Sequence, residues 1–439
     1  MTNSNYGRAS IALAGLWLLG CPAEDRDDPE MTGIGSLTIT ATGGGDDGDT
    51  GATGGGDAGD TGGLTSPADD SAGDEDGLNT KFDVGPNNGG PPSASDCMTD
   101  PAIDDDGDGF SEQTGDCNDC DPNVNPAAIE VVNNQPDMNG QIPEPADEDC
   151  DGGIDNIPPP CDGAFALDDN NPFDAAAAMG LCKLAAGPDD WGVVSAQWVR
   201  ANGNPAGGGA LHYGIQNNFG PNVSPQEGSQ MLALSSGTAR IPGQPGACGS
   251  ESCGQLGGGT APPNFPQDVP QCPGSSSIND DIALEVTLRA PSNATGYSYN
   301  FKFYSFEYPE YVCTQWNDQY IALVDPPPMG SINGNISFDA MTNPVSINIA
   351  FFEVCSGCPL GTSELIGNGF DTWDPPGITD AGGTSWLETT APVDSGTEVT
   401  IRFTIWDTGD ALWDSTVLID NFQWIADGGT VSVGTVPEG

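Results

Sequence analysis

The chain has a single histidine, His212, and nine basic residues among 439 residues, which excludes most histidine-based catalytic sites and multi-histidine metal centres. Its 65 acidic residues give a formal net charge of −56. A field of this sign repels nucleic acids and attracts cations, so we expect no nucleic-acid partner. After residue 21, no apolar run approaches the roughly 20 residues that span a bilayer. The 63 glycines and 38 prolines argue against a helical protein, because both residues disfavour helix interiors.

The N-terminus carries an export signal. The apolar run Ile11 to Gly20 follows a polar start and is typical of a signal peptide. Leu18-Leu19-Gly20-Cys21 resembles a bacterial lipobox, in which the cysteine becomes the lipidated first residue. We therefore expect residues 1–20 to be a lipoprotein signal peptide, with a lipid on Cys21 as the membrane anchor at the outer membrane or cell surface. The alternative is an ordinary secretory peptide with a chance cysteine.

The 13 cysteines support export, because removing Cys21 leaves twelve, enough for six disulfides in an oxidising compartment. The spacing does not determine how they pair. The two Cys-x-x-Cys motifs are Cys117/Cys120 and Cys355/Cys358. A zinc site would suit a reducing compartment, so in an exported chain disulfides are the favoured interpretation.

Residues 21–95 form an acidic tether rich in Gly, Asp and Thr. Gly43–Thr50 and Gly54–Thr61 are near-copies of one low-complexity unit, and Phe82 is the one aromatic residue. Such a segment buries too little apolar surface to offset the chain entropy, so the sequence predicts a disordered spacer. The alternative is a tether whose dispersed carboxylates collect cations.

Residues 96–162 form an Asp-rich cassette without Lys or Arg. Asp104, Asp106, Asp108 and Gly109 occupy positions 1, 3, 5 and 6 of a calcium loop. Calcium takes six to eight oxygen ligands, and alternate aspartates in a tight turn converge on one point. Phe110 would offer its carbonyl at position 7 and Glu112 its side chain at position 9. Gly115 stands at position 12, where an EF-hand has Glu, so Asp116 is the candidate to close the shell.

The rest of the cassette resembles the metal-binding repeat of MopE-type bacterial surface proteins, over about 55 residues. The matching residues are Asp116, Cys117, Asp121, Pro122, Pro126, Glu130, Asp149, Cys150, Asp151, Gly152 and Asp155. Departures are Cys120 in place of an Asp, the missing Cys after Glu130, and a longer segment from Asn133 to Pro145. The resemblance implies metal binding, and all-oxygen ligands indicate calcium. The predicted metal ligands are Asp104, Asp106, Asp108, Phe110, Glu112, Asp116, Asp119, Asp121, Asp149, Asp151 and Asp155.

Residues 163–427 form the body, followed by a tail, 428–439. The sequence predicts one short helix over Asp174–Cys182 with Asp174 as its N-cap. Short strands that alternate apolar and polar residues between Gly, Pro and Asn turns predict an antiparallel β-sandwich. The predicted strands are Trp191–Trp198, Ile282–Leu288, Tyr297–Phe306, Tyr320–Val324, Val345–Phe352, Glu398–Trp406 and Thr416–Trp424. The overall fold class is therefore mostly β, preceded by an irregular cassette and a tether.

The body resembles the choice-of-anchor L family of bacterial surface domains. The resemblance implies a surface-exposed β domain and transfers no catalytic residues. It lies in Asp174–Cys182, Gly192–Ser195, Tyr213–Gly220, Gly228–Arg240, Asn300–Tyr308, Asn317–Tyr320, Asp407–Asp410 and Asp414–Phe422.

Candidate sites in the body have structural alternatives. Asp407, Asp410, Asp414 and Asp420 bracket two strand ends and would either bind a second calcium or cap turns. Glu307 is either a buried acid with a raised pKa or a polar residue on an open strand face. Trp373, Trp386, Trp406 and Trp413 would stack on sugars or pack in the core. No Gly-x-Ser-x-Gly motif accompanies His212, so we expect no Ser-His-Asp site.

The interpretation that combines these features is a lipid-anchored, calcium-binding protein of the bacterial surface with a non-enzymatic role in adhesion or matrix contact. Its expected partners are the membrane, calcium, and glycans or surface proteins. The first alternative is a calcium-dependent carbohydrate-binding module. The second is a glycoside hydrolase with a carboxylate pair that includes Glu307, for which no catalytic motif appears.

Overall fold

The computed structural model describes residues 100–439 except 133–141, 143, 255, 350, 372–377, 427 and 439. The predicted signal peptide, the lipidation site Cys21 and the tether lie outside the described residues. The described residues belong to one compact unit. In this part of the chain, no helix is long and apolar enough to cross a membrane.

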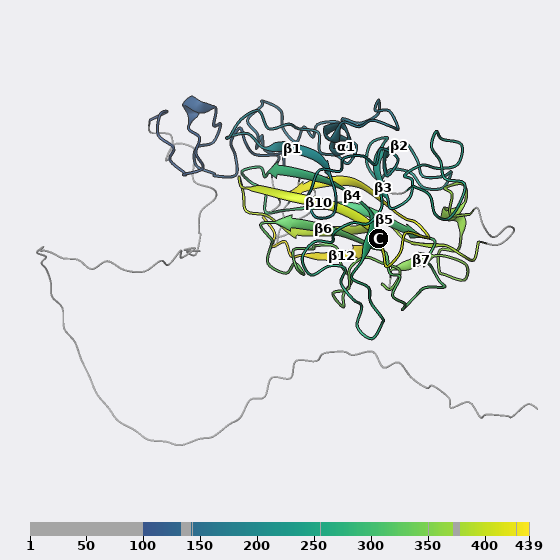
Figure 1. Ribbon diagram of the computed structural model, residues 1–439. Helices are drawn as coiled ribbons and strands as arrows, with labels where there is room; N and C mark the ends of the chain where they lie inside the picture. Colours follow the sequence, from purple (N-terminus) through teal and green to yellow (C-terminus); the bar gives the residue numbers. More distant parts are fainter. Residues whose placement is uncertain are drawn as a thin grey trace, which may run out of the picture. The chain divides into compact units, whose positions relative to one another are not determined.

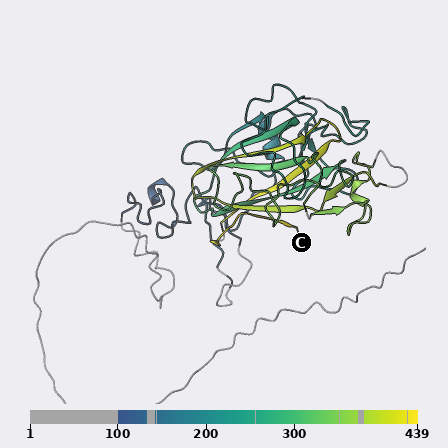
Figure 2. The same cartoon turned by 60° about the horizontal axis from the view of Figure 1, so that its bottom comes forward.

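The body is a two-sheet β-sandwich, which confirms the predicted fold class (Figures 1 and 2). One sheet has four strands in the order β1 (Gly192–Val199), β4 (Ile278–Arg289), β10 (Glu398–Thr408) and β6 (Gln319–Asp325). The second has eight strands, of which six follow the order β12 (Gly434–Pro437), β9 (Leu387–Pro392), β5 (Gly296–Ser305), β11 (Ser415–Ile425), β3 (Met231–Ser235) and β2 (Tyr213–Gln216). The other two, β7 (Phe352–Val354) and β8 (Gly382–Thr384), extend from β5. All the ladders between these strands are antiparallel.

The core lies between the two sheets. On β4 and β10 the inward residues pair across the ladder, with Leu284 opposite Phe403 and Val286 opposite Ile401. Phe403 meets Tyr299 of β5 edge to face, with ring centroids 5.1 Å apart. Every residue of β5 is buried, because a second apolar cluster around Tyr304 covers its other face. Alternation is therefore visible in β4 and β10 and absent from β5.

Two predicted elements differ from the structure. The helix α1 runs over Pro172–Ala177 and its N-cap is Asn171, whose Oδ1 accepts a hydrogen bond from Phe173 N at 3.2 Å. The prediction of Asp174 as N-cap was wrong because Pro172 suits the first helical position. The predicted strand Val345–Phe352 is absent among its described residues, where Val345 forms an isolated bridge to Tyr320 and Phe352 begins β7. Here the Asn348 side chain bonds Cys313 N and Asn317 in place of a ladder partner.

Disulfides cross-link the cassette and the loops. The described bonds are Cys117–Cys150, Cys161–Cys182, Cys248–Cys253, Cys272–Cys313 and Cys355–Cys358, and Cys120 is also disulfide-bonded. The preference for disulfides over a zinc site is therefore confirmed at both Cys-x-x-Cys motifs. Only the second motif closes on itself, while Cys117 bonds Cys150 at a distance of 33 residues along the chain.

Candidate metal centre in the acidic cassette

The first acidic loop of the cassette is held by its own aspartates. Asp104 accepts hydrogen bonds from Gly107 N at 2.6 Å and from Gly109 N at 3.0 Å. Gly107 and Gly109 have φ values of 85° and 99°, a left-handed conformation that side chains beyond glycine rarely adopt. The 3₁₀ turn η1 (Glu112–Thr114) follows. The Asp-Gly pattern thus bends the chain so tightly that alternate carboxylates face one side.

Carboxylates of this loop form two overlapping triads. Their ligand oxygens lie within 4.8 Å of one another in Asp104, Asp106 and Asp108, and again in Asp106, Asp116 and Asp119. One oxygen each of Asp106, Asp116 and Asp119 is buried and has no hydrogen-bond partner among the described residues. Burial, with the neighbouring carboxylates, raises the pKa of Asp106 to about 6. The arrangement brings like charges together and leaves lone pairs that a cation would satisfy.

A second loop repeats the spacing of the first. Asp147, Asp149, Asp151 and Gly152 stand at positions 1, 3, 5 and 6, as Asp104 to Gly109 do. Asp147 Oδ2 accepts a hydrogen bond from Gly152 N at 3.0 Å, the counterpart of the bond from Gly109 to Asp104. This repetition was not among the sequence predictions, in which the segment was only the end of a longer motif. The Asp-x-Asp-x-Asp-Gly spacing that the two loops share is the sequence signal that could have revealed this repetition.

The second loop also gathers carboxylates. Glu130 joins two groups, one with Glu148 and Asp155 and one with Asp147 and Asp149. Both oxygens of Glu130 are buried without a hydrogen-bond partner among the described residues. Burial, together with Asp149 and Glu148, raises the pKa of Glu130 to about 7. Glu130 was absent from the predicted ligand set, as were Asp147 and Glu148.

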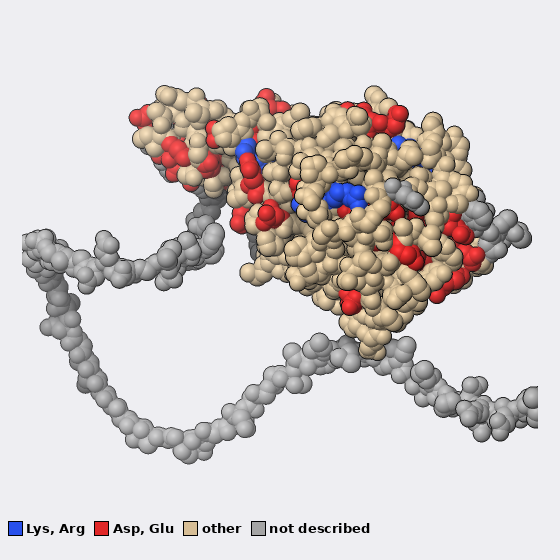
Figure 3. All heavy atoms as spheres, viewed as in Figure 1, with Lys and Arg blue, Asp and Glu red and all other residues tan. Residues whose placement is uncertain are grey.

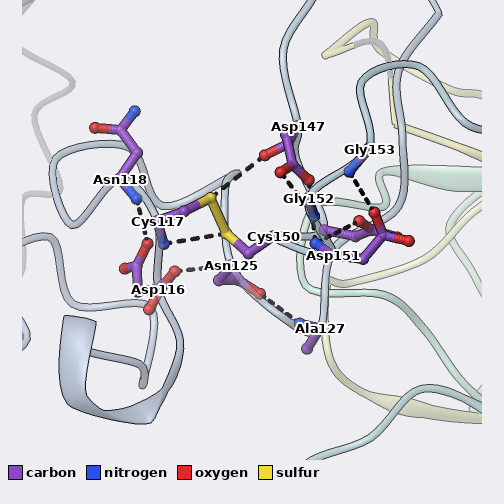
Figure 4. Close-up of a disulfide and its surroundings, with 12 residues drawn as sticks. Asp116, Cys117, Asn118, Asn125, Ala127, Asp147, Cys150, Asp151, Gly152 and Gly153 are labelled. Atoms are coloured by element: carbon purple, nitrogen blue, oxygen red, sulfur yellow. Dashed lines mark hydrogen bonds between the residues drawn. A yellow bond between two sulfur atoms is a disulfide. The ribbon is translucent and has the colours of Figure 1, made fainter.

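A disulfide joins the two loops, and Asn125 joins the first loop to the body. Figure 4 shows the Cys117–Cys150 bond between them, with Cys117 N donating to Cys150 Sγ at 3.1 Å. Asn125 Nδ2 donates to Asp108 Oδ2 at 2.7 Å, and Asn125 Oδ1 accepts from Ser292 Oγ at 2.7 Å. Ser292 belongs to the turn between β4 and β5. A carboxylate of the first loop is therefore linked through one amide to the body.

The other predicted ligands lie partly outside the carboxylate clusters. Glu112 has one buried oxygen without a described partner, while Phe110 N is bonded to Asp108 Oδ1 at 2.8 Å. Asp121 accepts from the backbone and side chain of Asn123, and lies in neither set of triads. Asp151 is exposed and accepts from Gly153 N at 2.7 Å, so it supports its loop and lies outside the triads as well.

The donor chemistry of the cassette fits a hard cation. Each cluster offers carboxylate oxygens, and the cassette cysteines among the described residues are disulfide-bonded. Calcium prefers such oxygen sets, whereas zinc and copper favour sulfur and imidazole. On the face shown in Figure 3, acidic side chains gather over the cassette and basic ones form a few small spots.

The acidic residues proposed as a second site in the body do not converge. Asp420 accepts from Gln226 N at 2.6 Å and Asp414 from Cys253 N at 2.7 Å, on different segments. Asp410 accepts from Leu412 N at 3.1 Å, and Asp407 is buried without a described partner. Within the described residues, groups of three or more carboxylates close enough to share an ion lie in the cassette.

The remaining candidate residues of the body that the structure describes are mainly buried or packed against its apolar clusters. His212 is buried with Nδ1 3.0 Å from Ser235 O, and burial lowers its pKa. Trp406 is fully buried in the core, Trp386 packs against the second apolar cluster, and Trp373 lies outside the described residues. Glu307 is 1% exposed, and burial raises its pKa well above the usual range. Of the two alternatives for Glu307, the buried acid is therefore correct.

Comparison with known proteins gives a family for the body. The family model described as the choice-of-anchor L domain matches residues 204–423, half of the chain. No curated protein matches the chain. A solved structure, the enzymatically active domain of bacteriophage CBA120 tailspike protein 4, aligns over 54% of this chain with 9% identity and a TM-score of 0.18. This chain covers 20% of that protein, and a likeness this weak carries no argument.

Proposed function

The chain belongs to the choice-of-anchor L family, and from this premise we propose that it is a calcium-binding protein held at the bacterial surface by a lipid on Cys21. Domains of this family are typical of bacterial cell-surface proteins. The proposed role is adhesion or matrix contact without catalysis, in which the cassette presents the β-sandwich at the end of the tether. Cell fractionation tests the anchor, because Cys21→Ser should release the protein from the membrane fraction.

The observation that carries the calcium proposal is the set of buried carboxylate oxygens without partners in two loops of the same design. Burying unpaired carboxylates close to one another is costly unless a cation or protons neutralise them. The first loop would hold calcium through Asp104, Asp106, Asp108, Asp116 and Asp119. The second loop would hold it through Glu130, Asp147, Glu148, Asp149 and Asp155. Each ion would neutralise the carboxylates of its own cluster and hold the residues of that cluster together.

Calorimetric titration of the full chain with calcium tests this proposal. We expect saturable binding at two classes of site, with Asp106→Asn removing one and Glu130→Gln the other. Asp105→Asn is the matched control, because Asp105 lies in the same loop, is exposed and belongs to no triad. Absence of binding at millimolar calcium would overturn the proposal. An equal loss in Asp105→Asn and Asp106→Asn would mean diffuse attraction to the net charge.

A further inference from the structure

A small pocket opens at one end of the sandwich, between two loops. The loop from β5 to β6 contributes Glu307, Tyr311 and Trp316, and the loop from β10 to β11 contributes Asp410, Leu412 and Trp413. Its volume is about 80 Å³. Drug-sized ligands occupy roughly 300–1,000 Å³, so this pocket suits one compact chemical group.

Of the three aromatic rings that line the pocket, Tyr311 stands nearly at right angles to each of the two tryptophans. Tyr311 and Trp316 have ring centroids 5.4 Å apart at 80°, and Tyr311 and Trp413 have centroids 4.7 Å apart at 78°. Each ring face carries a partial negative potential, so rings at right angles form the walls that cages for methylated ammonium groups use. A sugar ring instead stacks flat on one aromatic face and needs no second ring at right angles to it.

The fold holds the three rings in place. Trp413 adopts a left-handed backbone with φ of 67°, and its backbone N donates to Ser252 Oγ at 2.7 Å. A Cβ on Gly409 would lie 2.9 Å from Trp316 Cδ1, so glycine is needed for the indole to pack there. The Cys272–Cys313 disulfide ties down the loop between Tyr311 and Trp316. A left-handed non-glycine residue costs free energy and is concentrated at functional sites.

The carboxylates around this pocket lack a counter-ion. Glu307 is buried to 1% exposure, and its Oε2 accepts from Asp318 N at 3.1 Å. Asp318 and Asp407 are buried behind it, and neither oxygen of Asp407 has a partner among the described residues. Asp318 is satisfied by Thr408 N at 2.9 Å and Ser415 Oγ at 2.7 Å. Acidic groups without a basic partner are therefore gathered where the aromatic walls are.

The described part of the chain has no basic side chain to spare for these acids. Five of its six Lys and Arg residues form ion pairs elsewhere, and Arg240 donates to the backbone oxygens of Tyr213, Ala239 and Ala210. The five pairs are Lys183–Asp190, Arg200–Asp281, Arg289–Glu398, Lys302–Glu364 and Arg402–Glu285. A cation at this pocket must come from a ligand.

We propose that the pocket of Tyr311, Trp316, Trp413 and Glu307 binds an organic ammonium group, with quaternary methylammonium preferred. A metal ion would gain nothing from aromatic walls, and no carboxylate triad lies here among the described residues. Methyl groups fill the pocket that the rings line, and the positive charge faces both the rings and Glu307. The exposed Leu412 at the rim would contact the rest of the ligand.

The charge state of Glu307 couples binding to pH. Burial raises its pKa, and the charges of Asp407 and Asp410 add to the shift. The groups that face it are Asp318, Asp407, Asp410 and Tyr311, and none of them is basic. The empty pocket therefore keeps the acid protonated, and a bound cation favours the carboxylate. Binding should release a proton and tighten as pH rises.

Calorimetric titration of the full, calcium-saturated chain tests the proposal with choline, tetramethylammonium and neopentyl alcohol, which has a similar branched shape without charge. We expect both cations to bind saturably and to quench tryptophan fluorescence, and the alcohol to bind at least about tenfold more weakly. Vesicles of phosphatidylcholine, compared with vesicles of phosphatidylglycerol, distinguish a lipid headgroup from a soluble molecule as the source of the ammonium group. Binding to free choline alone assigns a soluble ligand, and binding to phosphatidylcholine vesicles as well assigns a lipid headgroup.

Three variants locate the site. Glu307→Gln keeps the size of the side chain and should weaken choline binding at least about tenfold and abolish its pH dependence. Trp316→Ala should abolish binding, and Trp316→Phe should restore part of it because a ring face remains. Glu310→Gln, an exposed acid on the same loop, is the control and should bind as the wild type does. Equal affinity for choline and neopentyl alcohol, equal loss in Glu310→Gln, or no binding of either cation would overturn the proposal.

Discussion

In the body, the buried Asp281 and the partly buried Glu285 are paired with Arg200 and Arg402, whereas in the cassette one oxygen of Asp106 and both oxygens of Glu130 have no partner among the described residues. All six described Lys and Arg residues lie in the body, and the cassette contains none. The body pairs some of its carboxylates with its own bases, whereas the cassette has no base and, under the proposed function, would take a cation from solution. The stability of the body should therefore be independent of calcium, and that of the cassette should depend on it.

The largest effect is expected from the core of the body. Phe403 is fully buried and packs on Tyr299, so Phe403→Ala leaves a cavity and should lower the free energy of unfolding by about 3–5 kcal/mol. Denaturant unfolding measures this loss, and calcium titration should remain unchanged. Val436→Ala, on the edge strand β12 and 56% exposed, is the control. A change in calcium affinity in Phe403→Ala would show that the two regions are not independent.

An intermediate effect is expected from the disulfide of the cassette. Replacing Cys117 and Cys150 together by serine removes a cross-link over 33 residues, worth about 2–4 kcal/mol to the region it closes. Hydrogen exchange should become faster in residues 100–156, calcium affinity should fall, and the amides of β4 and β10 should keep their protection. The double serine variant of Cys355 and Cys358 is the matched control. Unchanged exchange in the cassette would mean that the loops hold without the bond.

The third effect is a dependence of stability on pH, smaller per pH unit than the two losses above, and it concerns an acid of the body. Burial raises the pKa of Asp414 to about 8, from an ordinary value near 3.9. The folded state keeps this proton at pH values where the unfolded state loses it. The contribution of Asp414 to the free energy of unfolding is therefore fully present below pH 4 and is lost as pH rises towards 8. The loss approaches about 1.4 kcal/mol per pH unit between the two values.

Asp414→Asn should remove that contribution, because the amide oxygen still accepts from Cys253 N and cannot ionise. The melting temperature measured from pH 4 to pH 8 should then fall less steeply than in the wild type. Asp394→Asn, in an exposed turn, serves as control and should keep the wild-type slope. Parallel curves for Asp414→Asn and wild type would contradict the raised pKa.

The predictability of the fold depends on which faces are buried. β4 and β10 alternate and were predicted within a few residues, since one face of each packs in the core. β2 and β3 are buried on both faces and end among glycines, so periodicity gave no signal for them. The same limit applies to the cassette. Spacing revealed Asp104 to Gly109, but Glu130 reaches its cluster only through the folding of a distant segment.

The disulfide between Cys117 and Cys150 also has a mechanical consequence. Tension applied to the chain from its N-terminal side passes from Cys117 directly through the covalent bond to Cys150. Residues 121–149, with Glu130 among them, lie outside this path, while Cys120 carries a disulfide of its own. Under shear at a surface, that part of the acidic clusters would keep its shape while the load bypasses it.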